Sequence, residues 1–440
     1  MLDSPLIDAF LLRAFRFHTR GFLRMEETDG SLPPAPRDGA GYLYVHVPFC
    51  EVLCPFCSFH RVQHQHGRAQ RYFAALRTEI RRYHAAGFRF TGAYIGGGTP
   101  TTEPAELVET VALIRQLFGA QEISVETNPK DLRPDLLVAL RDAGVSRLSV
   151  GVQSFDDGLL REMERYDKYG SGAEIQERIS AAVPFFPTLN IDLLFNLPHQ
   201  TEALLERDLA IVRALGANQV SFYPLMSSPT VAPRMAAAMG APAGRRRQRA
   251  LYERIVAGLR PEFAPSSAWC FTRRGQTIDE YIVEADHYVG VGSGAFSYLD
   301  GTLYTTTFSL ARYEQLIAEG RCGISTRRRL RPAEQMRYAL LVRMFGLRLD
   351  RAWAERRFGP RFFRTVWGEL RTLELLGAAR RDAQGWTLNE RGMYWLMLMM
   401  SAFFESVNTY RDAMRAHVRE ELNEPAMICV PAGAPAGTRS

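Results

Sequence analysis

The sequence predicts an α/β protein built on a partial, six-unit parallel β/α barrel and followed by a smaller, mostly helical domain. Six short apolar segments are typical of buried strands, at residues 42–47, 93–95, 123–126, 147–150, 190–195 and 219–223. Helical patterns lie between them, near residues 68–85, 103–118, 133–143, 156–168 and 201–215. Regular alternation of strands and helices indicates a parallel sheet with its helices outside. A closed eight-unit barrel would need two more such units.

The chain divides into an N-terminal helix with a linker, the barrel, the helical domain and a disordered tail, predicted at residues 1–41, 42–300, 301–423 and 424–440. The N-terminal helix is amphipathic and spans Leu6 to Phe17. A glycine-dense run at 286–295 is expected to close the mouth of the barrel. The helical domain is expected to contain three helices, a hairpin at 377–388 and a further helix. The tail is rich in Pro, Ala and Gly, which predicts disorder.

Composition and charge are those of an ordinary globular enzyme. Hydrophobic residues make up 46% and charged residues 23% of the 440-residue chain. The 54 basic residues exceed the 48 acidic ones by six, an excess too small to indicate nucleic-acid binding. There is no apolar run of about 18 residues, which predicts no transmembrane segment, and no export signal. We therefore expect a cytoplasmic protein.

Three of the six cysteines lie within eight residues, as Cys50, Cys54 and Cys57 in the pattern C-x3-C-x2-C. Thiolates so close along one loop favour zinc or an iron–sulfur cluster. A cluster held by three thiolates leaves one iron open to a small molecule. A structural zinc site needs a fourth ligand, and the histidines that keep this alternative open are His46, His60, His64 and His66. A disulfide is disfavoured in a protein without an export signal.

Two further motifs follow predicted strands. The turn Gly96-Gly-Gly-Thr-Pro100 lets backbone N–H groups approach a ligand closely, although such turns also join strands to helices in many α/β proteins. Glu126 ends the third strand, where a carboxylate can accept hydrogen bonds from the hydroxyls of a ribose. The alternatives for Glu126 are a neighbour of a helix N-cap or a solvated acid.

Polar residues also stand near the ends of later strands. Gln153 and Asp192 each interrupt an apolar segment, and an unpaired polar group is costly to bury. Arg165 offers a planar fork that suits a carboxylate. It lies in the charged run 161–168, which could equally be a solvated helix face.

The cysteine pattern, preceded by Tyr44-Val-His-Val-Pro-Phe49, resembles the radical S-adenosylmethionine (SAM) superfamily. Within it, the chain is similar to the oxygen-independent coproporphyrinogen III oxidases and their haem-chaperone, haem-modifying and class C methyltransferase relatives, over residues 42–300 and loosely over 330–400. The resemblance implies a radical SAM barrel, a winged-helix-like C-terminal domain and a [4Fe–4S] cluster on the three cysteines. It also implies a reducing electron donor such as flavodoxin or ferredoxin.

The resemblance also assigns cofactor contacts. The residues that it places against SAM are Tyr44, Phe56, Gly97, Gly98, Thr99 and Glu126. Gln153, Arg165 and Asp192 match contacts to a second SAM molecule, so two SAM molecules per chain are expected. No side chain is assigned a catalytic role.

One departure from the family pattern bears on the reaction. The oxidases carry C-x3-C-x2-C-x-C, and here Phe59 stands in place of the last cysteine. This difference favours radical C-methylation of an sp2 carbon in a conjugated aromatic or tetrapyrrole substrate. Oxidative decarboxylation of a porphyrin, or other modification of a porphyrin or haem, is the enzymatic alternative. Haem binding by a chaperone and DNA binding through a metal knuckle are the alternatives from other classes.

Overall fold

The computed structural model describes residues 5–36, 41–241, 244–274 and 285–422, and its centre is a parallel sheet. The six core strands lie in the order β2-β5-β6-β7-β8-β9. Their bounds are Gly41–Val47, Phe90–Gly97, Glu122–Thr127, Arg147–Gln153, Thr188–Phe195 and Gln219–Pro224. All neighbouring pairs among the six are parallel. The predicted α/β fold with a partial barrel of six units is confirmed.

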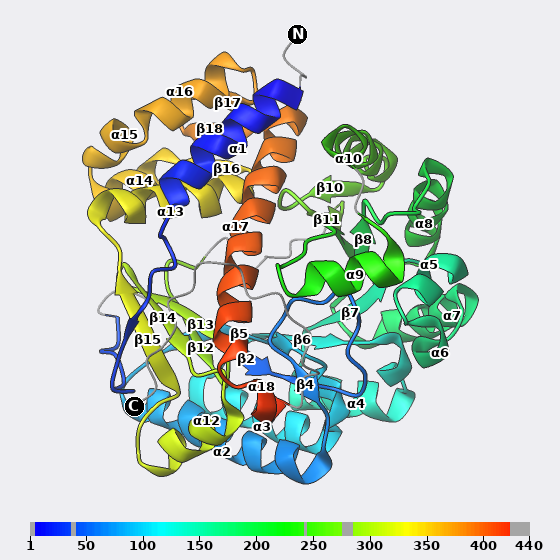
Figure 1. Cartoon of the computed structure of the whole chain (residues 1–440), viewed down its shortest axis with the longest axis vertical. Coiled ribbons are helices and arrows are strands. Elements are labelled where there is room, and N and C mark those ends of the chain that lie inside the picture. The colour runs from blue at the N-terminus through cyan, green and yellow to red at the C-terminus, as the bar shows by residue number, and fades with distance from the viewer. Residues whose placement is uncertain (1–4, 37–40, 242–243, 275–284, 423–440) are drawn as a thin grey trace.

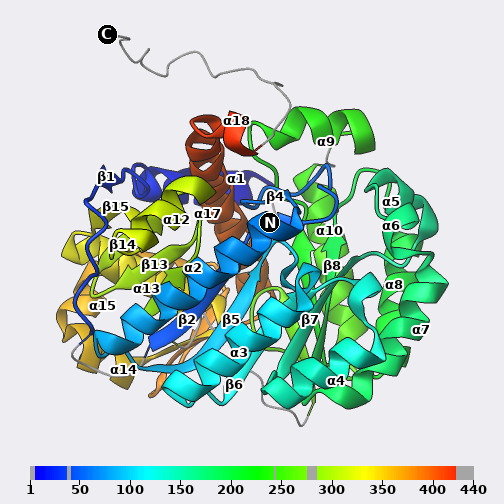
Figure 2. The same ribbon diagram turned by 90° about the horizontal axis from the view of Figure 1, so that it is seen from below.

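Helices cover the outer face of this sheet (Figure 2). They are α2, α3, α4, α7 and α8, with bounds His66–Ala85, Pro104–Phe118, Pro134–Ala143, Gly172–Ala182 and Glu202–Ala214. Apolar side chains fill the layer between helices and strands, because they are removed from water there. The helix expected at 156–168 is instead two short helices, α5 (Asp157–Glu162) and α6 (Tyr166–Tyr169). Glu164 interrupts them with a positive φ of 55°.

The main sheet continues beyond the six core strands and has thirteen strands among the described residues. On one side, β12 (Tyr288–Val291) pairs with β2 in parallel, and antiparallel strands β13 (Phe296–Leu299), β14 (Thr302–Thr306), β15 (Ile324–Arg329) and β1 (Glu26–Glu27) follow. On the other side, β11 (Cys270–Arg273) and β10 (Phe263–Pro265) are added to β9, and α10 (Arg245–Leu259) precedes them. β14 and β15 follow residue 300 and extend the same sheet. The domain boundary at residue 300 stays a prediction.

The C-terminal region is mostly helical (Figure 1). It contains α13 (Pro332–Phe345), α14 (Arg351–Phe358), α15 (Arg361–Thr365), α16 (Trp367–Leu375), α17 (Glu390–Ala416) and α18 (Arg419–Leu422). A small sheet is formed by β16 (Arg348–Asp350), β17 (Ala379–Arg381) and β18 (Gly385–Leu388), the last two from the predicted hairpin.

The N-terminal helix α1 (Pro5–Thr19) packs along α17, as Figure 1 shows. Asp8 of α1 is buried and accepts hydrogen bonds from Trp395 Nε1 at 3.0 Å and from Arg249 at 2.6 Å. The predicted tail at 424–440 lies outside the described residues. In the described ranges, none of the helices combines the length and the apolar character that crossing a membrane requires.

Candidate functional site

The cysteine loop directly follows β2, at the C-terminal end of the first core strand. Cys50 belongs to the short strand β3 (Phe49–Cys50), which pairs with β4 (Val62–Gln63). Cys54 is buried, Cys50 and Cys57 are half-buried, and all three are free thiols. The loop therefore lies at the edge where the chemistry of parallel α/β barrels is usually found.

Cationic side chains surround this loop. Arg61 donates to the carbonyl oxygens of Cys54 and Cys57, at 2.8 and 2.7 Å. Arg165 Nη1 lies 3.5 Å and Lys168 Nζ 4.0 Å from Cys54 Sγ. Burial alone would raise the pKa of Cys54, but the charges of Arg165, Lys168 and Arg61 outweigh it and lower that pKa. The loop therefore favours a thiolate at Cys54, the form in which cysteine binds metals.

The two guanidinium groups beside the cysteine loop are buried without a carboxylate partner. Arg61 and Arg165 are each 5% exposed, and the Nε atom of each has no hydrogen-bond partner. No ion pair joins either of them to a carboxylate within the part of the chain that the structure describes. A buried charge is costly unless an opposite charge accompanies it. Three thiolates holding an anionic inorganic cluster supply that charge, so these residues fit an iron–sulfur cluster.

The histidines considered as a fourth zinc ligand contact other protein groups. His46 Nε2 lies 2.8 Å from the carbonyl oxygen of His60, and burial lowers the pKa of His46 to about 4. His64 Nε2 and His66 Nδ1 contact the carboxylate of Glu103, at 2.7 and 2.8 Å. Among the described residues, no three His, Cys, Asp or Glu side chains gather around one point closely enough to hold a single ion. In a [4Fe–4S] cluster each iron takes its own thiolate, so the three cysteines need not meet at one ion.

Glu126 and Gly97 lie side by side at the ends of β6 and β5. The Gly97 N–H donates to Glu126 Oε2 at 2.9 Å, and the Tyr94 hydroxyl donates to Oε1 at 2.7 Å. Burial raises the pKa of Glu126. Gly97 has a φ of 113°, and a Cβ there would lie 2.4 Å from the His46 ring. Only glycine suits this position, and fixed protein donors hold the carboxylate.

The rest of the glycine turn packs against the cysteine loop. Gly98 N–H donates to the Val47 carbonyl and Thr99 N–H to the Phe49 carbonyl, both at 2.7 Å. A Cβ on Gly98 would lie 2.6 Å from the Phe49 oxygen. The expectation that these amides face a ligand is therefore not met, because protein oxygens occupy them. Thr99 Oγ1 instead lies 3.6 Å from Cys50 Sγ, so the turn supports the cysteine strand.

Gln153, Arg165 and Asp192 converge on Gly151 of β7. Asp192 of β8 is the register partner of Gly151. A Cβ at Gly151 would lie 3.0 Å from Gln153 Nε2 and 4.0 Å from Arg165 Nη2, and Arg165 also donates to the Gly151 carbonyl. Gln153 has a positive φ of 78° at an irregularity in the pairing of β7 with β8. Because Arg165 is buried, its alternative as a solvated helix face does not hold.

Asp192 is set in a polar network inside the barrel. Ser149 Oγ donates to Asp192 Oδ2 and Asn190 Nδ2 to Oδ1, both at 2.7 Å. Burial raises the pKa of Asp192, and the charge of Arg147 opposes this rise. The negative charge of Asp192 raises the pKa of Glu126 further. Two carboxylates therefore share one interior with the half-buried cation of Arg147 beside them.

Tyr44 and Phe56 lie at the edge of this arrangement. The Tyr44 hydroxyl is 2.8 Å from His46 Nδ1, and its ring stacks near that of Tyr94 at 6.2 Å between centroids. Phe56 is half-buried and packs against the main apolar core. Tyr44 therefore reaches the Glu126 side of the site, whereas Phe56 has the contacts of a core residue.

Several residues of the site were not predicted from the sequence. They are Arg61, Tyr94, Arg147, Ser149, Lys168 and Asn190. A polar residue inside an apolar strand is the signal that could have found Tyr94, Ser149 and Asn190. Arg61 and Lys168 carry no such signal, because an arginine or lysine in a loop or short helix is usually solvated.

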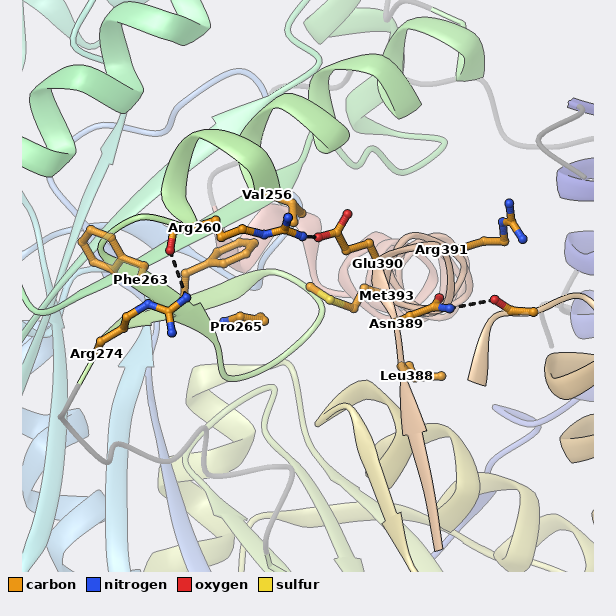
Figure 3. A pocket seen from close by; sticks show the side chains of 12 residues that line it. Val256, Arg260, Phe263, Pro265, Arg274, Leu388, Asn389, Glu390, Arg391 and Met393 are labelled. Atoms are coloured by element: carbon orange, nitrogen blue, oxygen red, sulfur yellow. Dashed lines mark hydrogen bonds and ion pairs between the residues drawn. The ribbon is translucent and has the colours of Figure 1, made fainter. Parts of the chain in front are cut away.

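A separate cavity of about 640 Å³ lies between the last strands of the main sheet and the C-terminal region (Figure 3). Residues of β10, β11, α10 and α17 line it, among them Phe263 and Met393, together with Arg274, which follows β11. Arg260 and Glu390 form an ion pair across it. None of the predicted cofactor residues lines this cavity.

Comparison with known proteins agrees with the geometry of the cysteine loop. The family model described as the radical SAM superfamily matches residues 44–210, which include the three cysteines, Glu126, Gln153, Arg165 and Asp192. Residues 44–210 of this chain are a radical SAM domain. Members of this superfamily use a [4Fe–4S] cluster and SAM.

The relatives of the chain lie in the branch of the coproporphyrinogen oxidase HemN. It is 29% identical to the haem chaperone HemW of Bacillus subtilis over 344 residues, 74% of this chain and 88% of HemW. It is 34% identical to the oxygen-independent coproporphyrinogen III oxidase of Escherichia coli over 201 residues, which are 43% of this chain and 42% of the oxidase. The match thus spans less than half the length of that oxidase.

The fold agrees with this branch over nearly the whole chain. The solved structure of HemN from Escherichia coli superposes with a TM-score of 0.70 and covers 86% of this chain and 91% of that one. Sequence identity in this superposition is 23%, so the likeness shows a shared fold.

Proposed function

We propose that this protein is a radical SAM enzyme that methylates an sp2 carbon of a conjugated aromatic or tetrapyrrole substrate and uses two SAM molecules. The observation that carries the proposal is the convergence of Gln153, Arg165 and Asp192 on Gly151, beside the cysteine loop. If only one SAM molecule bound, at Glu126, then Gln153, Arg165 and Asp192 would have no ligand to bind. The match to the family's second SAM site supports the assignment.

The chain's own residues divide the work of binding. Cys50, Cys54 and Cys57 hold the cluster, and Glu126 accepts hydrogen bonds from the ribose of the first SAM. The cluster with bound SAM supplies a 5′-deoxyadenosyl radical when an external donor such as flavodoxin or ferredoxin provides one electron. Arg165 binds the carboxylate of the second SAM through its planar fork.

Phe59 supports methylation over decarboxylation. In the oxidases a cysteine stands at this place, whereas here the Phe59 ring is 46% exposed and has the Arg411 guanidinium 4.9 Å from its centroid. The thiol that the oxidases offer is replaced by an exposed aromatic surface with the buried Arg411 guanidinium beneath it. Such a surface suits stacking against a planar conjugated substrate.

Product analysis tests the proposal. Reconstituted protein, reductant and methyl-labelled SAM are incubated with a panel of porphyrins and fused aromatic compounds. We expect S-adenosylhomocysteine together with 5′-deoxyadenosine, and label in the product. Asp192→Ala should suppress S-adenosylhomocysteine but leave some 5′-deoxyadenosine, whereas the exposed control Asp135→Ala should match the wild type. Release of carbon dioxide with no label transferred would favour decarboxylation instead.

Haem binding is the second candidate, and one observation favours it. The alignment with the haem chaperone HemW spans 88% of that protein, far more than the 42% spanned in the Escherichia coli oxidase. A haem-binding protein would give a stable Soret shift at fixed stoichiometry when titrated with haemin, without turnover of SAM. A methylase would give no saturable Soret shift unless haem is its substrate.

A further inference from the structure

The long helix α17 of the C-terminal region reaches the cysteine loop with its last turns (Figure 1). Arg415 Nη1 donates to the Phe59 carbonyl at 3.1 Å, and its Nη2 donates to the Arg61 carbonyl at 3.3 Å. Arg61 in turn donates to the carbonyls of Cys54 and Cys57. Two arginines in series therefore tie the helix to the backbone between the second and third cysteines.

This connection is shielded from water. Arg415 is 7% and Arg61 is 5% exposed, so both guanidinium groups have lost most of their hydration. Hydrogen bonds from a charged donor contribute more than neutral ones, and they are worth more where water does not compete. The Cys57 thiol lies within electrostatic reach of both arginines. The pair can therefore hold the shape of the loop and also act on the charge that the loop carries.

We propose that Arg415, acting through Arg61, is a positioning residue that orders the Cys54–Cys57 turn and raises the reduction potential of the cluster bound there. The second part rests on the proposed function, because it needs the cluster. Reduction adds one electron from an external reductant and makes the cluster more negative. A buried positive charge nearby stabilises the reduced form, which raises the potential.

Hydrogen exchange on the protein without its cluster tests the ordering role. Backbone amides of peptides covering residues 50–61 are followed by mass spectrometry in wild type, Arg415→Gln and Arg415→Lys. Loss of about one hydrogen bond to a charged group corresponds to roughly tenfold faster exchange in Arg415→Gln. Lysine keeps the charge but lacks the fork that bridges two carbonyls, so Arg415→Lys should also exchange faster.

Arg16→Gln is the matched control. It removes the same charge from a residue that pairs with Glu405 of α17 at 3.2 Å and is 58% exposed. Exchange in residues 50–61 should be the same in this variant as in the wild type. Should Arg415→Gln fail to fold by circular dichroism, the comparison of Arg415→Lys with Arg16→Gln decides the ordering role.

Potentiometry followed by electron paramagnetic resonance (EPR) tests the electrostatic role in reconstituted protein. Arg415→Gln should shift the midpoint potential to a more negative value, and Arg415→Lys should restore it towards the wild type. If the amides of residues 50–61 exchange as slowly in Arg415→Gln as in the control Arg16→Gln, the ordering role is refuted. If the midpoint potential of Arg415→Gln equals that of the wild type, the electrostatic role is refuted. A wild-type protein that binds no iron would refute the proposed function, while the exchange experiment would still decide the ordering role.

Discussion

Replacing Glu126 with glutamine should weaken SAM binding and leave iron binding intact. In the structure, Gly97 N–H and the Tyr94 hydroxyl each donate to one oxygen of this carboxylate. Glutamine has nearly the same shape, its carbonyl can keep the bond from Gly97, and its amide can donate to the Tyr94 oxygen. The variant therefore removes the charge and one acceptor without removing the local structure.

The size of the effect follows from the bonds that a ribose would make. A hydrogen bond to a charged group contributes about 1.5–3 kcal/mol. The NH2 group of glutamine cannot accept a bond from a hydroxyl, so one such bond is lost. At about 1.4 kcal/mol per factor of ten, SAM should bind about 10- to 100-fold more weakly.

Equilibrium dialysis of SAM against anaerobically reconstituted protein measures this effect. Iron content is determined on the same samples, so that loss of the cluster is not mistaken for loss of SAM contacts. The control is Glu122→Gln, which lies on the same strand but is exposed. Equal SAM affinity in Glu126→Gln and in this control would refute the role of Glu126.

Three further predictions concern the cluster and the fold. Cys54→Ala should lose the roughly four irons per chain expected of the reconstituted wild type, and iron retained in chemical analysis would contradict the assignment. Burial raises the pKa of Asp208 to about 7 from 3.8, so the folded state keeps this proton at a higher pH than the unfolded chain does. Stability should therefore fall as the pH rises from about 4 to about 7 and then level off, and thermal unfolding of Asp208→Asn should lack this fall. Gly98→Ala forces a Cβ against the Phe49 carbonyl and should destabilise the protein by about 1–3 kcal/mol. The control Gly67→Ala, where a Cβ meets nothing within 4 Å, should keep the wild-type melting temperature.

Apolar strands were the part of the fold that the sequence predicted best. The expected strand 190–195 lies within Thr188–Phe195, and 219–223 lies within Gln219–Pro224. Buried parallel strands form continuous apolar runs, and these are legible without any long-range information. The break between α5 and α6 was missed because Glu164, with its positive φ, is not a glycine or asparagine that would indicate it.

The site was predictable where a residue carries its own signal. The spacing of the cysteines and Glu126, next to last in β6, both pointed to the C-terminal edge of the sheet, where the structure places these residues. The sequence could not show that Arg415 contacts Arg61, because 354 positions separate them. Their contact depends on how α17 packs across the barrel, which no local pattern encodes. The same holds for the buried state of Arg165, which lies in a charged run.

The EPR spectrum of the reduced, reconstituted protein with and without SAM tests the central claim most directly. Three cysteine ligands leave one iron of the cluster open, so SAM should bind that iron and change the spectrum. The account predicts a [4Fe–4S]⁺ signal that shifts on addition of SAM and is absent in Cys54→Ala. A preparation that holds zinc and no iron, or a cluster whose signal SAM leaves unchanged, would contradict it.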